Sequence, residues 1–256
     1  MTFEKLDRIV ELTIKYTTLG TLSIGAGDQP QSTVDSPLIR IGGEPVIPGS
    51  SLKGALRSNL EAILAQRGVE VCVPYTAIPD RIRRDNRLRK EYLQKIERLD
   101  TCDPRDPVCP ICQMFGTAGG AQGLSGHVIV LDARLKDTFD PAILTERTHV
   151  AITRDTRAQA GGALVSVEAV DAGVEFSGII RLVNPEDWMV GAILRGLEVL
   201  GYLGVGAKKT SGYGQLQVEP QQVVIRKLTA TGWEATAGDL DAYRRAFDTR
   251  LAKATG

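Results

Sequence analysis

Apolar and polar residues alternate near the start of the chain. Over residues 8–16, RIVELTIKY, every second side chain is apolar and several are β-branched, which predicts a strand with one buried face. After residue 51 the period changes to that of a helix, and one helical face is apolar: Leu52, Leu56, Leu60, Ile63 and Leu64. We expect Ser50 or Ser51 to cap this helix and Gly68 to end it.

The remaining periodic segments predict an α+β fold. Strand patterns occupy residues 126–133, 163–170, 174–182 and 215–225. A second helix opens at Pro185, and a short surface helix is expected over residues 239–253. The order β–α–insertion–β–β–α–β is the ferredoxin-like, split βαβ order. We therefore predict one domain over residues 1–256 with a modified ferredoxin-like core and a large insertion over about residues 70–126.

Composition narrows the class of protein. Lys and Arg together number 31, as do Asp and Glu, so the formal net charge is zero. This balance argues against a protein that coats nucleic acid everywhere, but it permits local basic faces. No apolar run approaches the roughly 20 residues of a membrane span, and no charged-then-apolar leader is present. We expect a soluble, cytoplasmic protein.

The start of the first helix is a candidate anion site. Free backbone N–H groups and the positive helix end favour an anion there, and Gly49, Ser50 and Ser51 add close backbone approach and two hydroxyls. Lys53 and Arg57 lie four residues apart on one flank. A sugar-phosphate backbone would fit across this end. The alternative is an ordinary capped helix with solvated charges.

A late glycine-rich loop, residues 204–214, is a second candidate. Its glycines permit close backbone approach, and a short polar run supplies charge and hydroxyls: Lys208, Lys209, Thr210 and Ser211. The glycine and lysine spacing differs from that of a P-loop. The alternative is a flexible turn between a helix and a strand.

Three of the four cysteines fall close together in the chain. Cys109 and Cys112 form a C-x-x-C pair, and Cys102 precedes them. Thiolates at this spacing can hold a tetrahedral Zn²⁺, and a fourth ligand would come from Cys72 or His127. The surroundings lack the strand–helix context of a thioredoxin-like redox pair. The alternative is a set of unrelated buried thiols.

Asp35 is the one candidate catalytic residue. It lies on a turn-rich loop near the anion site, where a carboxylate could assist in-line attack on RNA by holding a divalent metal or by orienting a 2′-hydroxyl. The alternative is a turn residue before Ser-Pro. His127 and His149 lie in different segments, and the sequence joins them into no catalytic set.

Five segments, taken in order, make the chain similar to a known family. They are residues 35–37 (DSP), 47–54 (IPGSSLKG) with Arg57 and Glu61, 109–116 (CPICQMFG), 149–154 (HVAITR) and the 204–214 loop. The combination resembles the RAMP superfamily (repeat-associated mysterious proteins), and most closely the backbone subunit of type III CRISPR interference complexes. The resemblance covers about residues 5–225.

The resemblance implies a fold and a function. The fold would be an RNA-recognition-like core with a thumb hairpin, over about residues 149–170, that pushes between guide and target RNA. Copies would stack as a filament along CRISPR RNA, beside a large signalling subunit, a small subunit and a subunit capping the guide 5′ end. Each copy would cut the bound target RNA once, with a divalent metal, Mg²⁺ or Mn²⁺.

The resemblance also assigns residues. Asp35 would cut the target, and the cysteine insertion would hold zinc through Cys72, Cys102, Cys109 and Cys112. RNA contacts map to Gly49, Ser50, Ser51, Lys53, Arg57, His149, Arg154, Lys208, Lys209, Thr210 and Ser211. Thr33 and Val34 stand where the family often has glycine and isoleucine, which leaves cutting to be tested. The alternatives are a scaffold that only holds the guide, and a guide-processing nuclease of the same superfamily.

Overall fold

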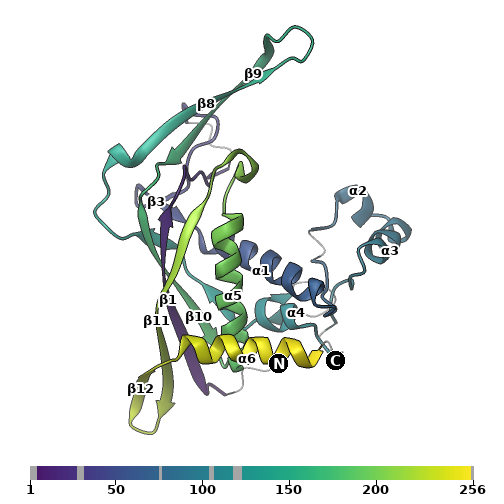
Figure 1. The fold of residues 1–256 in the computed structure, drawn as a ribbon, viewed down its shortest axis with the longest axis vertical. Helices are drawn as coiled ribbons and strands as arrows, with labels where there is room; N and C mark the ends of the chain where they lie inside the picture. Colours follow the sequence, from purple (N-terminus) through teal and green to yellow (C-terminus); the bar gives the residue numbers. More distant parts are fainter. Residues whose placement is uncertain (1–4, 28–31, 75–76, 104–106, 118–122, 255–256) are drawn as a thin grey trace.

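The computed structural model describes residues 5–27, 32–74, 77–103, 107–117 and 123–254. One large sheet has the strand order β12-β11-β1-β10-β7-β3-β2, with β6 also paired to β10 (Figure 1). Its strands are β1 (Arg8–Thr18), β2 (Arg40–Ile41), β3 (Glu44–Ile47), β6 (Val128–Val130), β7 (Ala133–Leu135), β10 (Glu175–Val183), β11 (Leu216–Thr229) and β12 (Gly232–Ala237).

The four central strands confirm the predicted core. They lie in the order β11-β1-β10-β6 and are antiparallel throughout. Counted along the chain, this is the fourth, first, third and second strand of a βαββαβ unit, which is the ferredoxin-like arrangement. The helices of this unit are α1 (Gly49–Gln66) and α5 (Asp187–Leu203). The expected strand at 163–170 instead belongs to a hairpin outside the sheet.

The helices cover one face of the sheet (Figure 1). The alternating residues of β1 explain this, because Val10, Leu12, Ile14 and Tyr16 are fully buried beneath the helices. Residues between them point to the opposite face, where Glu11 is ion-paired with Arg181 and Arg226. The periodicity of β1 therefore decides which face of the sheet builds the core.

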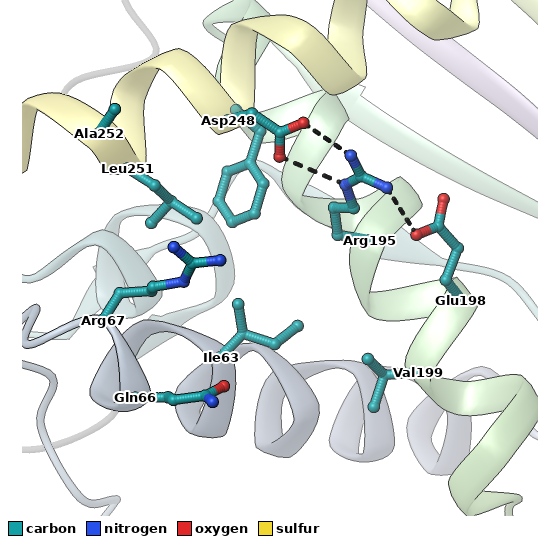
Figure 2. Close-up of a pocket in the computed structure, with 10 residues that line it drawn as sticks. Ile63, Gln66, Arg67, Arg195, Glu198, Val199, Asp248, Leu251 and Ala252 are labelled. Carbon is teal, nitrogen blue, oxygen red and sulfur yellow. Dashed lines mark hydrogen bonds and ion pairs between the residues drawn. The ribbon is translucent and has the colours of Figure 1, made fainter.

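Helix α6 (Leu240–Ala254) lies across α5. Gly191 permits the crossing, because a Cβ there would lie 2.0 Å from the Tyr243 carbonyl oxygen. Where α1, α5 and α6 converge, Arg195 reaches from α5 to Asp248 at 2.6 Å and to Glu198 at 2.9 Å (Figure 2). These contacts border a cavity of about 420 Å³ and attach α6 to the core. No helix in the described ranges is long and apolar enough to cross a membrane.

A two-stranded hairpin projects away from the body of the protein (Figure 1). It consists of β8 (Leu144–Ile152) and β9 (Gln159–Val170), which pair only with each other as a sheet, and η2 (Pro141–Ile143) precedes it. The hairpin occupies the segment where the thumb is expected and starts five residues earlier. Several of its apolar side chains are exposed, among them Val150 and Leu164.

The insertion packs beside the end of α1. The basic segment at 81–99 contains two short helices. Asp85 separates them, because its side chain caps the second helix by accepting from the N–H groups of Arg87 and Leu88. The elements of the insertion are α2 (Asp80–Arg83), α3 (Asn86–Lys95), α4 (Pro110–Phe115), β4 (Gly116–Thr117) and β5 (Leu124–Ser125).

Candidate nucleic-acid interface

The loop that carries Asp35 is docked on β9 at the base of the hairpin. The N–H of Asp35 donates to Oγ of Ser166 at 3.0 Å, and the N–H and hydroxyl of Ser166 donate to Oδ2 of Asp35 at 2.7 and 2.9 Å. These hydrogen bonds, the one from the backbone N–H first, lower the pKa of the Asp35 carboxyl below its ordinary value. Asp35 is therefore an exposed carboxylate that is ionised at neutral pH.

Glu168, two residues further along β9, fixes the other end of this loop. Its Oε2 accepts from the N–H of Leu38 at 3.0 Å, and its Oε1 is ion-paired with Arg40. Its own N–H donates to the carbonyl of Ser36 at 3.0 Å. A cavity of about 440 Å³ opens here, with Val34, Arg40 and Glu168 in its wall. The loop is thus attached to β9 at Asp35 and at the residues that follow it.

The segment 21–24 joins this region to the glycine-rich loop. Leu22 bridges Val170 of β9, and the Ser23 hydroxyl donates to the Glu168 carbonyl at 3.0 Å. From the other side, Ala207 donates its N–H to the Ser23 carbonyl at 2.9 Å. Asp35, the hairpin base and the loop at 204–214 therefore meet at one end of the sheet, although they lie far apart in the sequence.

The glycine-rich loop has a fixed shape. Gly206 has φ +90°, and a Cβ on it would lie 2.5 Å from the Ser23 carbonyl oxygen. Gly214 has φ +74°, and a Cβ there would lie 1.9 Å from the Val205 carbonyl oxygen. Both positions therefore require glycine. The close packing argues against a merely flexible turn.

The polar run of this loop faces solvent. Lys208 is half-buried in a left-handed conformation, and η3 (Lys209–Ser211) is exposed along its whole length. Among the residues that the structure describes, neither Lys208 nor Lys209 has an ion-pair partner. Two cations and two hydroxyls are thus left to meet a ligand beside the hairpin base.

His149 lies next to the same loop. Its Nε2 shares a hydrogen bond of 3.0 Å with the hydroxyl of Tyr213, and the two ring centroids are 5.7 Å apart. Tyr213 is buried and His149 is half-buried. Arg154 is exposed in the turn between β8 and β9. The sequence placed these residues in separate segments, and the contact with Tyr213 was not expected.

The start of α1 differs from the prediction. The helix begins at Gly49 with Pro48 as its N-cap, so neither Ser50 nor Ser51 caps it. Gly49 is pressed against β6, since a Cβ there would lie 2.2 Å from the Val130 carbonyl oxygen, and its N–H donates to Oδ1 of Asp132 at 2.8 Å. A carboxylate of the protein itself therefore occupies part of the expected anion site.

The two cations of α1 have different surroundings. Burial, and then repulsion by Arg57, lowers the pKa of Lys53 below its ordinary value. Arg57 points toward the insertion, where it donates to Glu61 at 3.0 Å and to the Gly116 carbonyl at 2.9 Å. Glu61 is also paired with Arg98 at 3.0 Å. Lys53 keeps its charge available, because no ion-pair partner for it lies within the described ranges, whereas Arg57 is already engaged.

The four cysteines form one group. The Sγ atoms of Cys72, Cys102, Cys109 and Cys112 all lie within 4.8 Å of one another, and all four cysteines are free. Backbone N–H groups donate to two of the sulfurs, from Cys112 to Cys109 at 3.5 Å and from Cys109 to Cys102 at 3.4 Å. Arg57 adds a guanidinium 3.8 Å from Cys112 Sγ. Four sulfurs with N–H donors and a nearby cation suit a metal bound by thiolates.

His127 is not part of this group. Its Nδ1 donates to the Val183 carbonyl at 2.6 Å, within the sheet. Hydrogen bonds from Cys112 and Cys72 lower the pKa of the Cys109 thiol, which favours a thiolate in the cluster. Of the two candidates for the fourth ligand, Cys72 is the one gathered with the other three sulfurs.

Comparison with known proteins identifies one family. The model of the RAMP superfamily matches residues 15–217, which is more than half of the chain. The matched range includes Asp35, the cysteine group, the hairpin and the glycine-rich loop. No curated protein matches the chain.

Proposed function

This chain belongs to the RAMP superfamily, and on that premise we propose that it is a backbone subunit of a type III CRISPR effector complex. Members of the family bind CRISPR RNA and work in multi-subunit complexes. The proposed subunit binds the guide, stacks with copies of itself in the cytoplasm and cleaves complementary target RNA at regular intervals. Its other partners are the large signalling subunit, the small subunit and the guide 5′-end cap subunit.

One observation carries the cleavage proposal. Asp35 is an exposed, ionised carboxylate held at the base of a projecting hairpin, with the unpaired Lys208 and Lys209 nearby through the segment 21–24. A hairpin that separates guide from target would present the kinked target strand to this carboxylate. The lysines and the exposed hydroxyls of η3 would hold phosphates beside it.

The proposed reaction is attack of a target 2′-hydroxyl on the adjacent phosphorus. As the 2′-oxygen attacks, its proton passes to water, and the bond to the 5′-oxygen breaks. This leaves a 2′,3′-cyclic phosphate and a 5′-hydroxyl, which takes a proton from water. Because its pKa is lowered, Asp35 is a weak base. Its contribution is to accept a hydrogen bond from the 2′-hydroxyl and orient it for in-line attack.

A divalent cation, Mg²⁺ or Mn²⁺, is part of the proposal and would neutralise charge on the scissile phosphate. The support for it is the family resemblance. Among the described residues, only the cysteines gather as a group of three or more potential ligands. Asp35 alone makes no protein cage for Mg²⁺, and its proposed contact with the 2′-hydroxyl needs no metal.

We assign zinc to the cysteine group, with Cys72, Cys102, Cys109 and Cys112 as the four ligands. A site with four protein ligands leaves no open position, so the zinc would be structural. It would link α4 to the segment that follows α1, because Cys112 lies in α4 and Cys72 follows α1. Arg57 would offset the negative charge of four thiolates, which gives it a role at the zinc in addition to the proposed guide contact.

Replacing both Lys208 and Lys209 with alanine is expected to weaken guide binding by roughly tenfold at physiological salt. Each lysine would neutralise about one phosphate, so the slope of log affinity against log salt should become shallower by about 1.4. Affinity for a single-stranded guide, measured at several salt concentrations, tests this. Lys253→Ala in the last turn of α6 is the control. An equal loss of guide affinity in this variant would contradict a guide contact at the loop.

The proposed function is tested with the assembled complex, a guide RNA and a labelled complementary target. We expect target fragments that differ by a constant length, with cyclic phosphate ends, in Mg²⁺ or Mn²⁺. A complex that binds the target without cutting it would contradict the proposed cleavage and support a scaffold that only holds the guide.

The contact between Tyr213 and His149 favours a second candidate, guide processing. A hydroxyl and an imidazole 3.0 Å apart are a pair that could move a proton. Burial of Tyr213 counts against this use. Cleavage of a precursor guide RNA by the isolated protein, lost in His149→Ala, would support it.

A further inference from the structure

Ser166 is the residue on which the Asp35 carboxylate rests. It lies on β9, opposite Thr148 of β8, and 131 residues separate it from Asp35. Its hydroxyl accepts from the Asp35 N–H and donates to Oδ2, while its N–H donates to the same oxygen. One side chain therefore contacts both the backbone and the carboxylate of Asp35, which fixes the rotamer of an otherwise exposed residue.

These contacts leave the other carboxylate oxygen available. Among the described residues, both side-chain hydrogen bonds of Asp35 go to Oδ2, and Asp35 has no ion-pair partner. Oδ1 is thus free for a ligand, and its direction is set by the anchoring of Oδ2. An anchored carboxylate loses little further rotational freedom when a ligand arrives, which is the advantage of preorganisation.

The loop contacts β9 at several points. Ser36 forms a parallel bridge with Val167, and Glu168 holds Leu38 and Arg40. Every one of these partners lies on β9, between residues 166 and 168. A shift of β9 relative to the loop would break all of these contacts, and residues 37–39 are also hydrogen-bonded to the segment 24–26.

We infer that Ser166 is a positioning residue for target cleavage, which ties the Asp35 carboxylate to the hairpin so that hairpin and carboxylate approach the target as one unit. The inference rests on the proposed function and deepens it. In this inference β9 is the element that positions the Asp35 carboxylate for cleavage. The rate of cutting then depends on Ser166, a residue that need not touch RNA.

A matched pair of variants tests the inference. Threonine and valine have nearly the same shape and both suit a strand, but only threonine keeps a hydroxyl at this position. In the complex assembled with guide RNA, Ser166→Thr should cut within about threefold of wild type. Ser166→Val should cut about tenfold more slowly, since the carboxylate loses its anchor.

Three measurements separate positioning from damage to the fold. Target affinity should stay within about twofold of wild type for both variants, so the loss lies in the single-turnover rate constant. Hydrogen exchange of the Asp35 amide should be faster in Ser166→Val than in Ser166→Thr, because this amide donates to the hydroxyl. Ser177→Ala on β10, an exposed serine of the main sheet, should cut like wild type.

The outcomes distinguish the two proposals. If wild type cuts, Asp35→Ala does not, and Ser166→Val equals Ser166→Thr in rate, the positioning role is wrong and the proposed function stands. A wild-type complex that binds the target and leaves it intact overturns the proposed function, and the positioning role with it. If Ser166→Val cuts more slowly than wild type and Ser166→Thr does not, the result supports both the positioning role and the proposed function.

Discussion

Replacing Asp35 with alanine is expected to stop target cleavage, with a loss of at least about 100-fold in the single-turnover rate constant. The carboxylate is the group that would orient the attacking 2′-hydroxyl, and alanine removes it without disturbing a buried contact, since Asp35 is exposed. Target affinity should change by less than about threefold. The measurement is cutting of a labelled target by the complex, with binding followed in parallel.

Two further variants make this result specific. Asp35→Asn keeps the size of the side chain and one oxygen but loses the charge, and we expect it to cut nearly as poorly as alanine. Asp155→Ala changes an exposed aspartate in the turn of the hairpin and should cut like wild type. Undiminished cutting by Asp35→Ala would remove Asp35 from the mechanism and leave the scaffold function.

Replacing Cys112 with serine is expected to release the zinc and destabilise the insertion. Cys112 is fully buried, and structural zinc sites contribute directly to folding. Without the metal, the remaining thiols and the Arg57 guanidinium would lose their common partner, and we expect the Tm to fall by roughly 10 °C. Elemental analysis should find one zinc per chain in wild type and a lower content in the variant.

The fourth ligand has its own control. His127→Gln alters the other residue considered for this role, and since Nδ1 of His127 is bonded to the Val183 carbonyl, the variant should keep its full zinc content. Cys72→Ser should lose it. Limited proteolysis within residues 70–126 should speed up in both cysteine variants and stay slow in His127→Gln. A zinc-free wild-type protein of unchanged stability would contradict the assignment.

The structure gives Arg57 a different environment from the one its motif suggested. In the sequence it lies four residues after Lys53, which placed both on one RNA-binding flank. In the folded chain its guanidinium faces Glu61, the Gly116 carbonyl and the cysteine sulfurs. Periodicity identified the helix and its buried stripe, but it carries no information on the insertion, which packs against this flank. Lys53 stays the stronger candidate for a guide contact.

Features that depend on neighbours in the chain were determined by the sequence alone. Alternation over residues 8–16 and the apolar stripe after Leu52 define the strand and the helix, because their periods of two and 3.6 are local geometry. The order of these elements then indicated the ferredoxin-like core. The C-x-x-C pair likewise indicated a candidate metal site, because its spacing is that of one tight turn.

Features that join distant segments were decided only by the tertiary structure. Cys72 lies 40 residues before Cys112 in the chain, yet it completes the cysteine group. Asp132 accepts a hydrogen bond from the Gly49 N–H, although 83 residues separate the two. Ser166 is one polar residue of an alternating strand, and nothing near it in the sequence marks it as a partner of Asp35. The local pattern determines on which face of a strand or helix a side chain lies. The packing of the hairpin and the insertion determines which distant residues that side chain contacts.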